Sequence, residues 1–321
     1  MPSLTALINE SQRIALIAHI EPDGDAVGSV AGLLGALEQL GKTVTGVLVD
    51  GVPSAFTFIK DASSIKTELP PLEDIDLCII LDAPDLSRSG RLDQMKAIAQ
   101  AGKLATIDHH LRGDVLRLSQ AAVHDLKASS TSELVYQVIK ELGVHITPDI
   151  ATALLTGIFT DTGGFQYANT TNETLDTAAE LMRRGAKLQI ITRNISRQKS
   201  LASLKLLGLA LQRLRITCQG KCAVSVLTNQ DITDAQASFE DITGIIGTIN
   251  VLPGVELSIL LIEIEPGLIR GTMRSGEGSK VNSSVLAKLL GGGGHPRASG
   301  FALPGKIVID GPTWEIIAKP E

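Results

Sequence analysis

Residues 19–29 read H-I-E-P-D-G-D-A-V-G-S and contain three side chains that could bind a metal. His19, Asp23 and Asp25 offer one imidazole and two carboxylates at positions i, i+4 and i+6. These hard donors suit Mg²⁺ or Mn²⁺, and Zn²⁺ once the histidine is included. An apolar run precedes the stretch and helical spacing follows it, so we expect it where a strand becomes a helix. The alternative is a surface turn in which an aspartate only caps the helix.

Three later apolar runs also end at residues that could bind a metal. In an open parallel sheet, ligands gather beyond the carboxyl ends of the strands, so donors at several strand ends can converge in one crevice. We therefore expect one site built from distant positions. The runs and their donors are 76–81 before Asp82, 104–107 before Asp108, His109 and His110, and 154–160 before Asp161.

The number of charged donors suits two divalent cations. Four carboxylates carry four negative charges that two such cations would neutralise, and two histidines can bind as neutral imidazoles. Two metals about 3.5–4 Å apart can lower the pKa of a bridging water and bind phosphate oxygens, which favours phosphoester hydrolysis. With oxygen and imidazole ligands and no thiolate, we expect Mn²⁺, with Mg²⁺ or Co²⁺ as alternatives. The six residues are His19, Asp23, Asp25, Asp82, His109 and Asp161.

Length and composition indicate an ordinary globular protein. The chain has 321 residues, 44% of them hydrophobic, which favours two domains over one. No apolar stretch approaches the ~18 residues of a membrane span, and the N-terminus lacks a basic region followed by an apolar block. We therefore expect a cytoplasmic protein that does not bind membranes. Because Cys78, Cys218 and Cys222 are odd in number and have no second ligand pair, we expect packing residues rather than a zinc site or a disulfide framework.

Charge is unevenly distributed along the chain. The net charge is −6, yet residues 267–300 hold five basic residues and one acidic residue, a local +4 that leaves −10 elsewhere. The acidic balance argues against a stable complex with duplex nucleic acid, whereas the basic segment is either a solvated face or a place for a small anionic substrate. Aromatic residues make up only 3%, so short RNA or a dinucleotide is favoured over a long strand. Phe165, Tyr167 or Phe301 could stack on one base, and a homodimer is left open.

The order of elements predicts an α/β protein. We expect a helix-flanked parallel sheet in residues 1–189, a helical connector at 190–215 and a smaller α/β domain with a mixed sheet in 216–321. In the first domain, strands are predicted at 13–18, 44–49, 75–81 and 104–107, and helices at 29–40, 92–101, 132–142, 148–159 and 172–184. In the second, strands are predicted at 223–227, 255–264 and 268–273, the last two as a hairpin, and a helix at 283–290.

A glycine run in the basic segment could bind phosphate. Residues 291–294 are four glycines, which let backbone N–H groups approach a phosphate closely. Arg274 offers a bidentate fork, and His295 offers a further donor. The alternative is a loop with only a structural role.

The motifs together resemble the DHH phosphoesterase superfamily, which is named for a sequence standing here as Asp108-His109-His110. H-x-x-P-D-G-D-A-x-G-S from residue 19, Asp82 after its strand, and D-T-G-G-F from residue 161 are present in the family's order. The resemblance implies that Asp82 bridges two metals and that the catalytic His110 contacts the scissile phosphate, while Asp108 orients the histidines. It further implies two ligand sets, His19, Asp23 and Asp82 for one metal, and Asp25, Asp82, His109 and Asp161 for the other.

The C-terminal part resembles the DHH-associated nucleotide-binding domain. This resemblance implies that substrate is bound by Arg274, Ser275, Gly292, Gly293, Gly294, His295 and Arg297. Size and layout are most similar to the branch of nanoRNases, 3′-phosphoadenosine-5′-phosphate phosphatases and cyclic-di-AMP phosphodiesterases. We expect a hydrolase that cleaves very short RNA or linear dinucleotides to 5′-monophosphates and removes phosphate from 3′-phosphoadenosine-5′-phosphate. The alternatives are a cyclic-di-AMP phosphodiesterase and an inactive nucleotide-sensing protein.

Three further residues are ambiguous. Arg88 fits the family pattern after Asp82, but it could equally pair with acidic neighbours. His124 and His145 match no motif, so we expect surface or packing roles for both.

Overall fold

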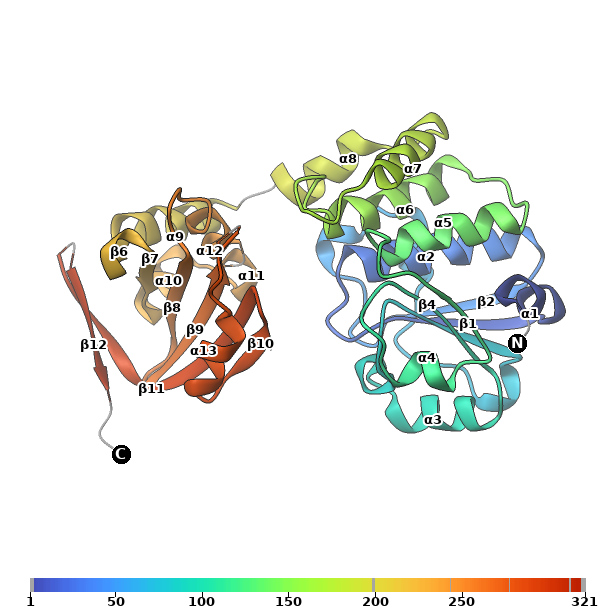
Figure 1. Ribbon diagram of the computed structural model, residues 1–321, viewed down its shortest axis with the longest axis horizontal. Coiled ribbons are helices and arrows are strands. Elements are labelled where there is room, and N and C mark those ends of the chain that lie inside the picture. Colours follow the sequence, from blue (N-terminus) through green and yellow to red (C-terminus); the bar gives the residue numbers. More distant parts are fainter. Residues whose placement is uncertain (1–2, 198–199, 243, 277, 312, 319–321) are drawn as a thin grey trace. The chain divides into compact units, whose positions relative to one another are not determined.

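The computed structural model describes residues 3–197, 200–242, 244–276, 278–311 and 313–318. The chain forms two compact units, Met1–Gln198 (unit 1) and Lys199–Glu321 (unit 2), and each is described by itself (Figure 1). The predicted connector at 190–215 falls across this division. Its first part forms the helix α8 and a π-helical turn in unit 1, and its second part forms the helix α9 in unit 2.

Unit 1 contains a five-stranded sheet in which all strands are parallel. The strand order is β2-β1-β3-β4-β5. The chain first places β2 on one side of β1 and then adds β3, β4 and β5 in turn on the other side. In open α/β folds, ligands bind beyond the carboxyl edge of the sheet at such a reversal of strand order. The strands are β1 (Arg13–Ile17), β2 (Thr43–Val47), β3 (Leu77–Leu81), β4 (Leu104–Asp108) and β5 (Ala121–His124).

Helices cover both faces of this sheet, as Figure 1 shows. Alternate strand residues pack into two different cores: Leu16 and Ile79 face α2, α5 and α6, whereas Ile17 and Ile80 face α3 and α4. Continuous apolar strands are typical of a parallel sheet that is buried on both faces. The helices of unit 1 are α1 (Leu4–Glu10), α2 (Gly24–Gln39), α3 (Leu92–Gln100), α4 (Asp114–Leu118), α5 (Thr131–Glu141), α6 (Pro148–Asp161), α7 (Asn172–Arg183) and α8 (Leu188–Thr192).

The structure confirms the helix predicted at 148–159 and corrects the conflicting expectation that residues 154–160 end a strand. These residues belong to the helix α6, so Asp161 ends a helix and does not follow a strand. The side chain of Thr147 caps this helix by accepting a hydrogen bond from the backbone N–H of Ile150, and Pro148 occupies the first turn. Almost every residue of 150–159 is buried, so the run shows no polar face, and the capping residues at its start identify the helix.

Unit 2 contains a mixed sheet. The strand order is β10-β11-β9-β8-β7-β6, with β12 paired to β11, and only β7 and β8 run parallel to each other. The predicted hairpin about 265–267 joins β8 and β9. The strands are β6 (Arg215–Thr217), β7 (Cys222–Leu227), β8 (Leu257–Glu265), β9 (Leu268–Ser275), β10 (Gly293–His295), β11 (Ala298–Asp310) and β12 (Thr313–Ala318).

Two apolar cores also flank the sheet of unit 2. Leu260 and Ile262 of β8 face the helices α9 to α12, whereas Leu257 and Leu261 face Trp314 of β12. Within the described residues, no helix of either unit is long and apolar enough to cross a membrane. The helices of unit 2 are α9 (Leu201–Gln212), α10 (Asn229–Ala235), α11 (Phe239–Ile242), α12 (Ile245–Ile249) and α13 (Ser283–Leu289).

Candidate functional site

The donors predicted from the sequence converge at the carboxyl edge of the unit 1 sheet. His19 lies two residues after β1, Asp82 directly follows β3, and Asp108 is the last residue of β4. Because β1, β3 and β4 are adjacent parallel strands, His19, Asp82 and Asp108 lie at the same edge of the sheet. Asp161 reaches it from the C-terminal end of α6.

Asp23 and Asp25 enter the site from the start of α2. Asp23 is the residue that caps the helix, and its Oδ1 atom accepts hydrogen bonds from the backbone N–H groups of Asp25 (3.0 Å) and Ala26 (3.1 Å). The same Oδ1 atom lies 3.8 Å from Nε2 of His19. The sequence presents helix capping and metal binding as alternative roles for an aspartate here. The position of Asp23 is compatible with both roles.

Asp82 stands between two groups of donors. Its Oδ2 atom lies 3.5 Å from Nε2 of His19, while its Oδ1 atom lies 3.7 Å from Nε2 of His109. His109 Nε2 is in turn 3.4 Å from Oδ2 of Asp161. Among the described residues, donor atoms within 4.8 Å of one another form three groups: His19, Asp23 and Asp82; Asp25, His109 and Asp161; and Asp82, His109 and His110.

Hydrogen bonds to the backbone fix the orientation of both imidazoles. Nδ1 of His19 donates to the carbonyl of Ile20 at 2.7 Å, and Nδ1 of His109 donates to the carbonyl of Ala128 at 3.3 Å. A carbonyl can only accept, so each ring carries its proton on Nδ1 when neutral. Nε2 of each ring is then left as a donor atom facing the carboxylates.

Asp25 is held by the N-terminus of α5, which the sequence did not indicate. Its two carboxylate oxygens accept the backbone N–H groups of Thr131 (2.6 Å) and Ser132 (2.9 Å). The hydroxyl of Thr131 also donates to Oδ1 of Asp82 at 2.9 Å. These donors stabilise negative charge at a helix N-terminus and leave further oxygen lone pairs for a cation.

Gly157 of α6 is a second residue that sequence reasoning missed. A Cβ atom at this position would lie 2.0 Å from Oγ of Ser132 and 2.5 Å from Oδ1 of Asp25. Both separations are shorter than any van der Waals contact allows, so only glycine lets α6 pass this close to Asp25. The apolar run around Gly157 contains no signal for this contact, because the two partners are distant in sequence.

The carboxylates carry more negative charge than their neighbours balance. Burial, followed by the charges of Asp82, Asp161 and Asp23, raises the pKa of Asp25 well above its usual value. Burial, together with Asp82, also raises the pKa of Asp161 to about 7. A divalent cation would offset the repulsion among these carboxylates. The mixed set of carboxylates and imidazoles fits such an ion.

His110 lies beside these groups and is held from two sides. Its Nδ1 atom donates to Oδ1 of Asp108 at 2.9 Å, a bond that raises the pKa of His110 although partial desolvation opposes the shift. Nε2 of His124 donates to the carbonyl of His110 at 2.7 Å. We expected His124 to be a surface or packing residue, but β5 pairs it with Asp108 of β4 and thereby brings it to the site.

The predicted substrate residues of unit 2 lie around the β10–β11 hairpin. The strand register places Arg274, Ala298 and His295 directly opposite one another on β9, β11 and β10. Directly opposed residues share one face of a sheet, so Arg274 and His295 flank the small Ala298. Arg297 is exposed in the hairpin turn, where its carbonyl accepts the backbone N–H of Ser275 at 3.0 Å.

Ser275 and part of the glycine run have structural contacts. Ser275 is buried on the opposite sheet face, where it pairs with Leu257 and its hydroxyl donates to the carbonyl of Pro296 at 3.5 Å. Gly293 and Gly294 belong to the strand β10 and do not form an open loop. A Cβ atom at Gly292 would lie 2.1 Å from the carbonyl oxygen of Gly300, so this glycine is needed for the hairpin to close.

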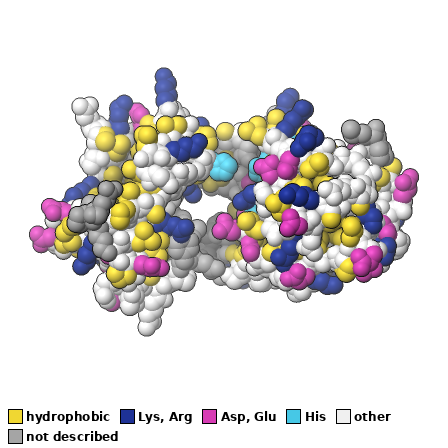
Figure 2. Space-filling model, turned by 90° about the horizontal axis from the view of Figure 1, so that it is seen from below, with side chains coloured by type: hydrophobic (Ala, Val, Ile, Leu, Met, Phe, Trp, Pro, Cys, Tyr) yellow, Lys and Arg dark blue, Asp and Glu magenta, His cyan; other side chains and the backbone are white. Residues whose placement is uncertain are grey.

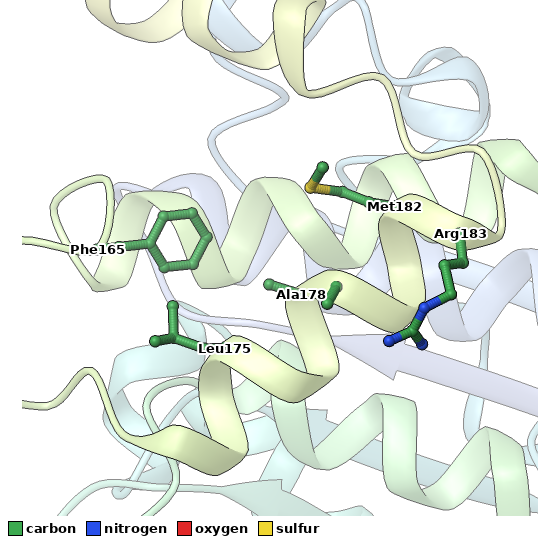
Figure 3. A pocket seen from close by; sticks show the side chains of 6 residues that line it. Phe165, Leu175, Ala178, Met182 and Arg183 are labelled. Atoms are coloured by element: carbon green, nitrogen blue, oxygen red, sulfur yellow. The ribbon is translucent and has the colours of Figure 1, made fainter.

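Two further features of unit 1 are the side chain of Arg88 and an apolar pocket. Nη2 of Arg88 is 3.4 Å from Nδ1 of His19, which places this exposed guanidinium beside the site. An apolar pocket of about 440 Å³ lies between Phe165 of the D-T-G-G-F motif and the helix α7, with Leu175 and Met182 on its helical side (Figure 3). Phe301, which we expected to be able to stack on a base, is instead buried in unit 2.

Comparison with known proteins supports the motif assignment. Residues 13–158 match the model of the DHH family, N-terminal domain. The bifunctional oligoribonuclease and PAP phosphatase NrnA of Thermus thermophilus is 32% identical over 292 residues, which cover 91% of this chain and 84% of that protein. The cyclic-di-AMP phosphodiesterase GdpP of Geobacillus thermodenitrificans is 28% identical over 307 residues, covering 91% of this chain and 45% of that protein.

A solved structure agrees with the fold of most of the chain. The crystal structure of an exopolyphosphatase-related protein from Bacteroides fragilis superposes with a TM-score of 0.82 at 27% sequence identity. The superposition covers 92% of this chain and 88% of that one. Together with the motifs and the extent of the match to the Thermus protein, it shows that the chain belongs to the DHH phosphoesterase superfamily.

Proposed function

We propose that the protein is a metal-dependent phosphohydrolase that releases nucleoside 5′-monophosphates from very short RNA and linear dinucleotides. We further propose that it removes phosphate from 3′-phosphoadenosine-5′-phosphate, the compound abbreviated PAP in the name of the Thermus relative. The observation that carries the proposal is the position of Asp82, whose two carboxylate oxygens face two separate groups of donors. A carboxylate in that position can bridge two cations.

In this proposal His19, Asp23 and Asp82 hold one cation, and Asp25, His109 and Asp161 hold the other together with Asp82. Two bound divalent cations, which we propose to be Mn²⁺ with Mg²⁺ or Co²⁺ as substitutes, would polarise the phosphate and lower the pKa of a bound water. All six donors lie together in one site, which supports an enzyme over an inactive nucleotide-sensing protein.

The remaining residues of the site orient the substrate. His110 donates from Nδ1 to Asp108, so its Nε2 atom is available to a phosphate oxygen at the scissile bond. His124 fixes the backbone that carries this imidazole. Arg88 lies beside His19 and can bind a second phosphate oxygen through its planar fork.

Unit 2 would bind the part of the substrate that does not react. Arg274 and His295 share one sheet face with the small Ala298 between them, which leaves room for a flat nucleotide. Contacts to that distal nucleotide contribute binding energy that positions the scissile phosphate.

A substrate panel tests the proposal. The full chain would be assayed with Mn²⁺ on pAp, pApA, short RNA, cyclic-di-AMP and pyrophosphate. We expect hydrolysis of pApA, short RNA and pAp. Faster turnover of cyclic-di-AMP than of pApA would favour the activity named for the GdpP relative, and no turnover of any phosphoester would refute the proposal.

The cytoplasmic location, the absence of a duplex nucleic-acid complex and the homodimer stay predictions from the sequence. In the view of Figure 2, basic and acidic side chains are interspersed over the surface, with no broad basic face visible on that side.

A further inference from the structure

The turn between β6 and β7 brings two cysteines together at the edge of the unit 2 sheet. The antiparallel register pairs Thr217 with Cys222, and Cys218 is the next residue after Thr217. The register and the turn therefore place Cys218 and Cys222 at the two ends of one short turn, and each thiol shifts the pKa of the other. Both cysteines are free.

The backbone of this turn keeps the two thiols close. Cys218, Gln219 and Gly220 all lie in the left-handed region, with φ values of +53°, +57° and +91°. The backbone N–H of Lys221 donates to the carbonyl of Cys218 at 3.2 Å and closes the turn. Two successive non-glycine residues in this region are uncommon, and they curl the chain so that the ends of the turn meet.

The two thiols differ in reactivity. Cys218 is exposed, and its pKa is lowered by the hydrogen bond with Cys222 and by the hydroxyl of Thr217, which lies 3.7 Å from Sγ. Burial, the bond with Cys218 and the nearby Glu256 raise the pKa of Cys222 to about 11. Lys221 pairs with Glu256 at 2.8 Å and is the adjacent cation. Cys218 is therefore the nucleophile of the pair, since the thiolate is the reactive form.

Cys78 provides an internal reference. It lies inside β3, where burial raises the pKa of its thiol to about 12. A buried thiol in apolar surroundings is inert towards polar oxidants. The expectation that all three cysteines are packing residues therefore holds for Cys78 and is wrong for the exposed Cys218.

We propose that Cys218 and Cys222 form a reversible disulfide by exchange with a small-molecule disulfide such as oxidised glutathione. The Cys218 thiolate attacks one glutathione sulfur, the glutathione S–S bond breaks, and one glutathione leaves as its thiolate. The Cys222 thiol then loses its proton and attacks Sγ of Cys218, and the second glutathione leaves. Two protein thiols are oxidised, and one molecule of oxidised glutathione is reduced to two of glutathione.

Mass spectrometry of the full-length protein tests the proposal. Native protein would be incubated with oxidised glutathione and quenched with acid, and its free thiols would then be alkylated in denaturant. We expect a peptide cross-linked between Cys218 and Cys222, one alkylated cysteine at Cys78, and complete reversal by dithiothreitol. Accumulation of disulfide-linked dimers, or modification of Cys78 in the native protein, would overturn the assignment.

Two variants separate the roles of the thiols. Cys222→Ser removes the resolving thiol, so glutathione should remain bound to Cys218 as a stable mixed disulfide. Cys218→Ser removes the nucleophile, so Cys222 should stay unmodified over the same time. Serine at either position is nearly isosteric, and the circular dichroism spectrum verifies that each variant folds. Absence of the mixed disulfide in Cys222→Ser, or equal labelling in both variants, would contradict the proposed order of attack.

Discussion

The proposed metal donors of unit 1 and the proposed substrate residues of unit 2 are held in different ways. Asp25 and Asp82 are 1% and 3% exposed, and each accepts hydrogen bonds from α5. Arg297 and His295 are exposed on or beside a short hairpin. Chemistry at a metal centre requires donors fixed within fractions of an ångström, whereas binding a distal nucleotide requires only a few contacts. Changes in unit 1 should therefore affect every phosphoester, and changes in unit 2 only substrates with a distal nucleotide.

The largest effect among the supporting residues is expected for Gly157→Ala. The added Cβ atom would displace Ser132 or Asp25, because it would lie 2.0 Å and 2.5 Å from their side-chain oxygens. We expect activity on pApA and on bis-p-nitrophenyl phosphate to fall by at least ~30-fold and metal affinity by at least ~10-fold. Steady-state kinetics and Mn²⁺ titration measure both effects.

Gly208→Ala is the matched control for this change. Gly208 lies in α9 and a Cβ atom there would meet nothing within 4 Å. Alanine should leave activity unchanged and stabilise unit 2 by about 0.5–1 kcal/mol, because glycine is unfavourable inside a helix. If both variants lose activity equally, the contact of Gly157 with Asp25 does not explain the loss.

Arg274→Ala should separate the two units in function. If unit 2 anchors the distal nucleotide, kcat/KM for pApA should fall by about 10-fold, roughly one charged hydrogen bond. Bis-p-nitrophenyl phosphate has no distal nucleotide, so its hydrolysis should stay within about threefold of the wild type. Equal losses on both substrates would place Arg274 in the catalytic machinery or in the stability of unit 2.

His124→Leu should have a smaller effect within unit 1. The variant loses the hydrogen bond from His124 to the carbonyl of His110, which is 2.7 Å long. We expect kcat to fall by about fivefold on both substrates, with KM and metal stoichiometry unchanged. Partial recovery of kcat in His124→Gln, which keeps an N–H donor, would identify the positioning role of His124. His145→Leu serves as a control. A change in metal stoichiometry in His124→Leu would contradict the positioning role.

The smallest effect concerns the stability of unit 2. Asp231 is the third residue of α10, where it accepts from the backbone N–H of the capping residue Thr228, and it pairs with both terminal nitrogens of Arg213. Although burial opposes the shift, these partners lower the pKa of Asp231 below its usual value. A lowered pKa stabilises the fold above the unfolded value, and that stabilisation disappears as the pH falls through the folded value. Asp231→Asn should thus lower the free energy of unfolding by about 1 kcal/mol at pH 7. Denaturant titrations should show the difference shrinking below about pH 4; a constant difference would refute the electrostatic cause.

Local sequence predicts the parts of this protein that depend on local chemistry. The apolar strands before His19, Asp82 and Asp108 indicate the parallel sheet and the edge where the donors meet. Thr147 and Pro148 identify the start of α6. The convergence of the donors follows from the rule for strand ends, which holds for any sheet of this type.

Other parts of the site depend on contacts between segments that are distant in sequence. The N–H groups of Thr131 and Ser132 reach Asp25 only because α5 begins beside α2, and no local pattern records that position. The run before Asp161 also fits a strand end, because a helix buried on all sides shows no polar face, and only the cap at Thr147 and Pro148 favours the helix. The thiols of Cys218 and Cys222 meet because of the register of β6 and β7, which spacing alone does not give.

The central claim is that Asp82 is shared by two cation sites, and metal stoichiometry tests it most directly. Calorimetric titration with Mn²⁺ should show two sites in the wild type. His19→Ala should remove one of them, because His19 belongs to a single donor group, whereas Asp82→Ala should remove or severely weaken both and abolish hydrolysis of every phosphoester. Two intact sites in Asp82→Ala, or near-wild-type turnover at saturating Mn²⁺, would contradict the shared ligand and with it the two-metal account.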